Sequence, residues 1–349
     1  MNAVTGAHLV GSVPLPDSET VFRTVGRELG PYLARMPDGE TGNRIRWIGW
    51  QREMLQHHPA METDTDTPPF EVRQWDGVLI RTQHWLRFKA GVDPAMVTFD
   101  TGYAQAARDS YAIFRRLRDS GEIPAGVRFQ VSLPTPMATG YSCVSPSALA
   151  AYLPVYERAL FIALRDITDA IPHRDLSIQW DVCQEVLVFE HYYPHPAPDY
   201  KADIAAELAR LGDAVPDGVE CGYHLCYGSP RDEHLVMPKD AAIMVEMTRD
   251  LGTRLRRRMD FLHLPVPKDR TDDAYFAPLA DLSLPAETAL YLGLIHYADP
   301  VGDRARIAAA HKVVPRFGVA SECGWGRTDP ARVPNLLAAH RDAVEHGRS

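Results

Sequence analysis

Residues 220–226 read ECGYHLC, residues 241–258 read AAIMVEMTRDLGTRLRRR, and residues 260–266 read DFLHLPV. The first and third segments are short and apolar, as expected for buried strands. In the middle segment apolar residues recur at helical spacing, and its end is rich in arginine, which favours the C-terminus of a helix. A strand, a helix and a second strand in this order predict a βαβ unit with parallel strands.

The same alternation extends over most of the chain. Further helical patterns occur at residues 147–171, 303–314 and 333–344. The eight strand candidates are Ala7–Val13, Leu33–Asp38, Val127–Leu133, Leu176–Val182, Glu220–Cys226, Asp260–Val266, Ala289–Tyr297 and Gly318–Cys323. No G-x-G-x-x-G follows the first strand and no P-loop motif occurs, which argues against a nucleotide-binding open sheet. The sequence therefore predicts an α/β protein with a closed (β/α)8 barrel of the TIM type.

One domain is expected to span residues 1–349. This length exceeds the ~100–200 residues typical of one domain, but α/β barrels commonly reach ~250 or more as a single unit. Residues 56–105 break the strand and helix rhythm, since 57–70 is polar with prolines and 77–87 looks like a strand. We expect this span to be an insertion, folded over the mouth of the barrel as a hairpin.

Composition restricts the partners of the protein. The net charge is −9, and no basic run or face stands out, which argues against nucleic acid or an anionic membrane surface. The five cysteines are odd in number and irregularly spaced, so a secreted disulfide framework is not expected. Without a signal peptide or an apolar run of about 18 residues, the pattern predicts a reduced cytoplasmic protein. No feature specifies an oligomeric state.

Two segments carry candidate metal ligands. His224 and Cys226 are two residues apart on a strand, so they share a face, and they lie at the strand end where barrel enzymes place their chemistry. Cys221 falls on the opposite face and is interpreted as a small buried hydrophobe. The segment 321–327, SECGWGR, ends the last strand, and its glycines allow a turn directly after Cys323. Closure of the barrel would bring the three side chains together.

Two thiolates and an imidazole form a donor set that suits zinc better than magnesium or calcium. Three protein ligands with one exchangeable position are typical of a catalytic zinc site, where the metal can hold a substrate thiol as thiolate. A H-x-C pair alone is a weak signal, and ordinary packing of a strand end is the alternative. The position of Cys323 at a matching strand end favours the metal.

Other polar residues are candidates for substrate contacts. Residues 36–44, MPDGETGNR, form either a solvated loop or a binding loop in which Glu40 accepts an ammonium group and Arg44 a carboxylate. Asp181 has inward strand parity, and a buried carboxylate needs a partner. His296 follows the seventh strand and is either a proton shuttle or a hydrogen-bonded wall residue.

Three motifs resemble a known family: HLVGSVP at 8–14, HLCY at 224–227 and ECG at 322–324. They are similar to the catalytic C-terminal half of cobalamin-independent methionine synthase. They also resemble the wider superfamily that includes uroporphyrinogen decarboxylase and zinc-dependent coenzyme M methyltransferases. The resemblance follows the motif order over nearly the whole chain. The N-terminal half of the full-length methionine synthases has no counterpart here.

The resemblance implies that zinc is the cofactor and that His224, Cys226 and Cys323 are its ligands. The family usually adds a glutamate from the strand after the H-x-C strand, and that strand has none here. His263 on that strand and Glu322 beside the last cysteine are the candidates for a fourth ligand.

The resemblance also implies substrate contacts. The early turn with Gly11 and Ser12 corresponds to the segment that holds the amino-acid part of the thiol. Asp181 corresponds to the aspartate that binds the substrate amine, and the segment Gly39–Arg44 resembles an acidic element near the second strand.

Together these features predict a zinc-dependent transferase that moves a methyl or other alkyl group to or from a small thiol. The partners would be this thiol and an alkyl donor, for which a folate-like compound is a candidate. One alternative is a metal-independent decarboxylase or lyase of the uroporphyrinogen-decarboxylase type. Another is a non-catalytic barrel that binds a small ligand. Metal content separates the first two.

Overall fold

The computed structural model describes residues 2–193 and 198–347, and its centre is a sheet of eight parallel strands. The order β1-β12-β11-β10-β9-β8-β7-β2 follows the chain around the sheet. Two further parallel bridges, Ala7 with Leu33 and Ser12 with Gly39, join its two ends. The strands are β1 (Ala3–His8), β2 (Arg35–Pro37), β7 (Arg128–Pro134), β8 (Leu176–Val182), β9 (Glu220–Leu225), β10 (Phe261–Pro265), β11 (Ala289–Gly293) and β12 (Arg316–Ala320). The predicted (β/α)8 barrel is confirmed.

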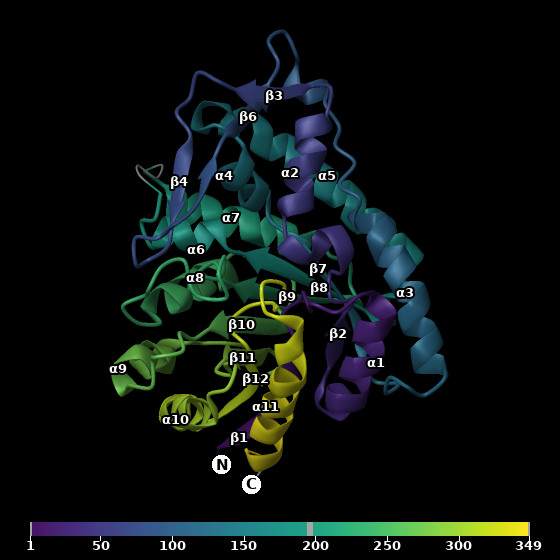
Figure 1. Ribbon diagram of the computed structural model, residues 1–349, viewed down its shortest axis with the longest axis vertical. Helices are drawn as coiled ribbons and strands as arrows, with labels where there is room; N and C mark the ends of the chain where they lie inside the picture. Colours follow the sequence, from purple (N-terminus) through teal and green to yellow (C-terminus); the bar gives the residue numbers. More distant parts are fainter. Residues whose placement is uncertain (1, 194–197, 348–349) are drawn as a thin grey trace.

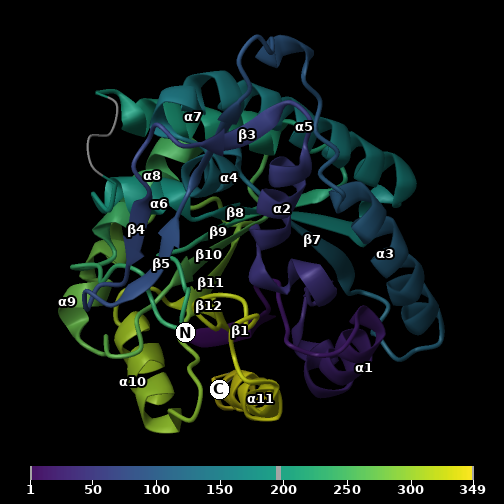
Figure 2. The same ribbon diagram turned by 45° about the horizontal axis from the view of Figure 1, so that its top comes forward.

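Helices surround these strands on the outside (Figure 2). The longer ones are α1 (Ser18–Leu29), α3 (Tyr103–Asp119), α5 (Leu149–Ala170), α7 (Tyr200–Asp213), α8 (Ala242–Gly252), α10 (Pro300–Ala310) and α11 (Val333–His346). The shorter ones are α2 (Gly49–His57), α4 (Pro136–Cys143), α6 (Gln184–Phe189) and α9 (Asp273–Phe276). One hydrophobic core extends from Val4 to Val344. The assignment of residues 1–349 to one domain stays a prediction.

The insertion near residues 56–105 is confirmed, and it lies between β2 and α3 (Figure 1). It contains two antiparallel pairs, namely β3 (Met61–Asp64) with β6 (Trp85–Phe88) and β4 (Phe70–Arg73) with β5 (Leu79–Gln83). The hairpin β4–β5 is tied to loops of the barrel mouth. The Arg73 backbone N–H donates to the Tyr192 hydroxyl at 3.0 Å, and Gln74 Nε2 donates to the His234 carbonyl at 3.0 Å.

The first and the last of the predicted strands had wrong boundaries. The first was expected at Ala7–Val13, but β1 begins at Ala3 and ends at His8. Residues 9–13 stay apolar because they are buried over the barrel, where Gln130 donates to the carbonyls of Leu9 and Val10. The last strand was expected to reach Cys323, but β12 ends at Ala320, where its ladder with β1 ends.

One further strand and one helix were predicted to extend beyond their actual ends. The strand expected at Ala289–Tyr297 ends at Gly293, so the residues up to Tyr297 form a loop. The helix expected at 241–258 ends at Gly252. The arginines that follow do not extend it, since Arg257 and Arg258 pair with the Asp260 carboxylate.

The segment Pro146–Ala170, which contains α5, is long and apolar enough to cross a membrane by length and composition alone. This corrects the expectation that no apolar stretch reaches that length. Its residues Tyr152, Tyr156 and Leu160 are buried and belong to the hydrophobic core. Since a core helix passes the same test, the finding is weak evidence for a membrane span.

Arg306 on α10 is fully buried and holds two loops of the barrel mouth together. Its Nε donates to the Leu294 carbonyl at 2.8 Å, and its Nη2 donates to Asp299 Oδ2 at 3.0 Å. It also pairs with the buried Asp303 carboxylate and donates to the Lys268 carbonyl. The guanidinium group therefore replaces backbone pairing where β10 and β11 have ended.

We expect Arg306→Met to lower the free energy of unfolding by about 3–5 kcal/mol, because Asp303 would remain buried without its charged partner. Urea denaturation followed by circular dichroism measures the loss. Arg304→Met on the same helix is the matched control, since Arg304 is exposed. It should change stability by no more than about 0.5 kcal/mol. Equal effects of the two variants would contradict a structural role for the buried arginine.

Candidate active site

Neighbouring strands place three polar side chains at one level of the barrel. Asp181 on β8 pairs in register with His224 on β9, and His224 pairs in register with His263 on β10. All three are buried. Parallel strands end at the same edge of a sheet, so this level lies at the C-terminal mouth, where barrels carry their functional groups.

The two cysteines follow directly after their strands. Cys226 is one residue beyond β9, and its backbone N–H still donates to the Val182 carbonyl at 2.9 Å. Cys323 is three residues beyond β12, in the turn that precedes Gly324. That turn needs glycine, because a Cβ on Gly324 would lie 2.4 Å from Ser12 Oγ. The close approach to Ser12 holds Cys323 against the barrel mouth.

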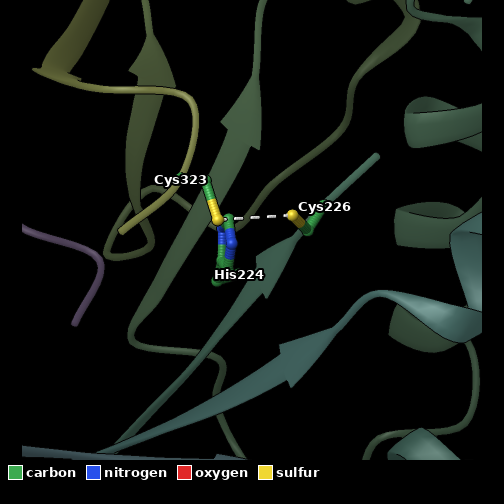
Figure 3. A group of neighbouring side chains, drawn as sticks. All are labelled: His224, Cys226 and Cys323. Carbon is green, nitrogen blue, oxygen red and sulfur yellow. Dashed lines mark hydrogen bonds between the residues drawn. The ribbon is translucent and has the colours of Figure 1, made fainter. Parts of the chain in front are cut away.

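The three predicted ligands converge on one point (Figure 3). The sulfurs of Cys226 and Cys323 are 3.6 Å apart, and one potential ligand atom from each of His224, Cys226 and Cys323 lies within 4.8 Å of the others. The expectation that barrel closure brings these side chains together therefore agrees with the geometry. The opposite-face residue Cys221 is fully buried.

The groups of this cluster are neutral in the protein alone. A hydrogen bond with Cys183 raises the pKa of the Cys226 thiol, and a hydrogen bond with Cys226 together with burial raises the pKa of the Cys323 thiol. Burial lowers the pKa of His224 well below its ordinary value. A bound divalent cation would displace the protons of the two thiols, whereas the neutral imidazole already offers a lone pair.

His263 contacts His224 rather than the sulfurs. Its Nδ1 lies 2.7 Å from His224 Nδ1, and its Nε2 lies 3.0 Å from the Ser321 carbonyl oxygen. A carbonyl only accepts, so Nε2 of His263 carries the proton. Burial lowers the pKa of His263 to about 3, so the ring is neutral and carries only one proton. Its Nδ1 is therefore unprotonated and accepts a hydrogen bond from His224 Nδ1. This leaves the lone pair of His224 on Nε2.

Glu322 points to a different partner. Its carboxylate Oε2 lies 3.2 Å from His234 Nε2, and both side chains are largely buried. Burial raises the pKa of Glu322 well above its ordinary value and lowers the pKa of His234 to about 3. Neither Glu322 nor His263 belongs to the cluster of convergent ligand atoms.

Two carboxyl groups lie beside the cluster. Burial and the neighbouring Asp181 charge raise the pKa of Glu40 to about 8, and burial raises the pKa of Asp181 to about 7. Asp181 Oδ1 accepts from Gln179 Nε2 at 2.8 Å, and its Oδ2 accepts from Trp47 Nε1 at 3.2 Å. Glu40 has a left-handed backbone with φ 47°. Gly11 leaves room for its carboxyl group, which a Cβ there would approach to 3.3 Å.

The remaining substrate candidates have partners within the protein. Arg44 pairs with Asp38 at 2.6 Å, so it is not free in the way that carboxylate binding would need. Ser12 Oγ accepts from the Gly326 N–H at 3.1 Å. His296 Nε2 donates a hydrogen bond to the Val266 carbonyl at 3.0 Å, and the residue lies outside the main cavity of the mouth. This arrangement fits a hydrogen-bonded wall residue better than a proton shuttle.

This cavity has a volume of about 690 Å³. The predicted residues that line it are Gly11, Ser12, Glu40, Asp181, His224, Cys226 and Cys323. Its wall also includes Val72 and Ile80 from the insertion and Trp47 from the loop after β2. Sequence reasoning missed a set of arginines on the wall, Arg46, Arg52, Arg81 and Arg327. They come from four separate elements, so no local pattern identifies them.

The sequence matches no protein-family profile and no curated protein. Among solved structures, the chain is similar to a B12-independent methionine synthase from Shewanella sp. W3-18-1 in complex with selenomethionine. That likeness has a TM-score of 0.60 at 13% identity and covers 99% of this chain and 98% of the other. A protein assigned as a vitamin B12-independent methionine synthase from Listeria monocytogenes gives 0.55 at 13% identity, with 99% of both chains covered. The chain thus has the fold of these proteins, and the resemblance drawn from the motifs is confirmed at that level.

Proposed function

We propose that the protein is a zinc-dependent transferase that moves a methyl or other alkyl group to or from a small thiol. The observation that carries this proposal is the convergence of two cysteine sulfurs and one imidazole in a cavity that also holds two carboxyl groups. The two sulfurs are 3.6 Å apart. The fold that the chain shares with methionine synthases supports the same reaction class.

The donor set fits zinc. Two zinc–sulfur bonds of about 2.3 Å at the tetrahedral angle would separate the sulfurs by about 3.8 Å. The observed separation is 3.6 Å. The lone pair of His224 Nε2 is the third donor, since Nδ1 is engaged with His263. A zinc ion held there would lower the pKa of a bound substrate thiol.

The other residues would bind and orient the substrate. Asp181 and Glu40 present carboxyl oxygens beside the cluster, where they can accept the ammonium group of an amino-acid thiol. Ser12 ties the loop of Cys323 to the barrel through its bond with Gly326. With the substrate sulfur fixed, attack in line on an electrophilic carbon needs positioning and no covalent intermediate on the protein.

We also propose that the fourth metal position belongs to the substrate. Both ring nitrogens of His263 are engaged, and the Glu322 carboxyl group lies 3.2 Å from His234 Nε2, outside the cluster of ligand atoms. His263 then acts as a support that orients His224. Such supports change metal affinity by roughly 10–100-fold.

His263→Phe should therefore weaken zinc binding roughly 10–100-fold without removing a ligand. His263→Asn, whose amide can both accept and donate, should recover part of the affinity. Competition with a chromophoric chelator measures affinity. In the metal-free wild type, ¹⁵N shifts should find the proton of His224 on Nδ1. Unchanged affinity in His263→Phe with a proton on Nε2 of His224 would contradict the support role.

The experiment that tests the function is elemental analysis of protein purified without an affinity-tag metal, with an assay of alkyl transfer between thiols and donors. Stoichiometric zinc and transfer that stops with a chelator would support the proposal. Activity without zinc would favour the metal-independent decarboxylase or lyase instead. Zinc without any turnover would favour a small-ligand-binding barrel.

The cytoplasmic location and the absence of nucleic-acid and membrane partners stay predictions. All five cysteines are free thiols in the structure, as a reduced compartment would require. The small thiol and the alkyl donor are the proposed partners.

A further inference from the structure

The main cavity has an excess of positive charge. Four arginines line it, and only two acidic residues, Glu40 and Asp181, do so. Within residues 2–193 and 198–347, none of the four arginines forms an ion pair with a carboxylate, whereas nearby Arg44 is neutralised by Asp38. The whole chain has a net charge of −9, so this local excess does not reflect a generally basic surface.

Arg52 lacks an acceptor for part of its guanidinium group. Its Nη2 donates to the His84 carbonyl at 2.7 Å, while its Nη1 is buried without a hydrogen-bond partner. A buried donor left unpaired costs about 1–3 kcal/mol, more when charged. The Cys143 thiol beside Arg52 is only a weak acceptor, so an oxyanion of a bound molecule would complete the hydrogen bonding of this guanidinium group.

Arg81 on β5 of the insertion lies in the same region. Its Nη2 reaches Gln83 Oε1 only at 3.4 Å, so most of its donors are available. Arg52 donates to the carbonyl of His84, which lies three residues after Arg81, and both arginines line the cavity together with Cys143. Two planar guanidinium groups on the wall of one cavity suit a carboxylate or a phosphate group.

The volume of the cavity leaves room for a second molecule. Cavities of about 300–1,000 Å³ hold drug-sized ligands, and this one measures about 690 Å³. An amino-acid thiol at the metal cluster would fill only a part of it. The insertion lines the same cavity with Val72, Ile80 and Arg81.

We propose that Arg52 and Arg81 bind an oxyanion group, carboxylate or phosphate, of the second substrate. Arg46 and Arg327 add positive charge to the same cavity. The anion site is inferred from the contacts of these arginines and does not depend on the proposed function. The identification of the anion as part of the alkyl donor does rest on that function. The insertion then determines specificity, since it supplies Arg81.

The test is calorimetric titration of the full chain with two probes, inorganic phosphate and glutarate. Wild type should bind at least one probe saturably, and binding should weaken as salt rises. Arg52→Gln and Arg81→Gln should each weaken it by about tenfold or more. Arg115→Gln is the matched control, because Arg115 is exposed on α3 and lies outside the cavity. Tighter binding of phosphate or of glutarate identifies the type of anionic group.

Failure to bind either probe, or binding unchanged in both Arg52→Gln and Arg81→Gln, would overturn the proposal. Arg81 is exposed on a hairpin, so its variant should fold even if the Arg52 variant does not. Zinc content and thiol binding should stay unchanged in these variants, which separates this proposal from the function. Anion binding without alkyl transfer would leave the anion site intact and refute only its role in transfer.

Discussion

Cys323→Ala will lose bound zinc and alkyl transfer together, in a protein that still folds. The sulfur of Cys323 lies 3.6 Å from that of Cys226, and its removal leaves only one sulfur and one imidazole at the cluster. Two ligands without a third bind zinc far more weakly than three, and the ligand geometry is lost with it. Mass-spectrometric metal analysis and a single-turnover transfer assay measure the two losses.

Cys221→Ala is the matched control. Cys221 is a buried cysteine on β9, and Cys226 is a buried cysteine one residue beyond that strand, but the Cys221 side chain has the opposite strand parity and is absent from the cluster. It should keep its zinc and its activity. If Cys323→Ala retained stoichiometric zinc and full activity, the metal assignment would be wrong. If metal-free wild type regained activity with added zinc and Cys323→Ala did not, the assignment would stand even for protein that loses zinc on purification.

The eight strands could be predicted because parallel strands buried on both faces read as short apolar runs. Leu176–Val182 was predicted with the boundaries of β8, and all its residues are buried. The predicted strand ends were wrong where the chain stays buried after its backbone pairing with the neighbouring strand has ended. Residues 9–13 are as apolar as a strand, yet their carbonyls accept from Gln130 side-chain donors and from loops. An apolar pattern indicates that a segment is buried, but it does not indicate whether its backbone groups pair with a neighbouring strand.

The cluster His224, Cys226 and Cys323 was within reach of sequence reasoning, because strand parity is local and barrel closure is a rule of the fold. The role of His263 was not, since it depends on a carbonyl of Ser321 on another strand end. Arg44 was a candidate for binding a substrate carboxylate, and the structure pairs it with Asp38 in its own loop.

Asp181→Asn should raise KM for an amino-acid thiol roughly ten- to a hundredfold, with a smaller change in kcat. A hydrogen bond between charged groups contributes about 1.5–3 kcal/mol, which corresponds to this range. The Asn side chain keeps the Oδ1 acceptor that faces Gln179, while its amide nitrogen cannot accept from Trp47 Nε1, so one of the two hydrogen bonds at this position is retained. Glu185→Gln is the control, since Glu185 is a fully buried carboxyl group outside the cavity.

The pH dependence separates loss of substrate binding from loss of the fold. Burial raises the pKa of Asp181 to about 7, so its ionised form destabilises the folded protein at higher pH. The stability that its protonated form contributes is present at low pH and is lost as pH rises through about 7. At pH 8 Asp181→Asn should then unfold no more easily than wild type, although it binds the thiol more weakly.

The same pair predicts how binding changes with pH. An ammonium group favours ionised carboxylates, so wild-type affinity should increase as pH rises through the pKa values of Glu40 and Asp181, up to the pKa of the amine. In Asp181→Asn the charge that helps to raise the pKa of Glu40 is gone, so Glu40 ionises at lower pH. The rise in affinity should move to lower pH in this variant, while its plateau stays below that of wild type. A KM profile that keeps its position and its plateau would remove Asp181 from the substrate site, whatever the metal cluster does.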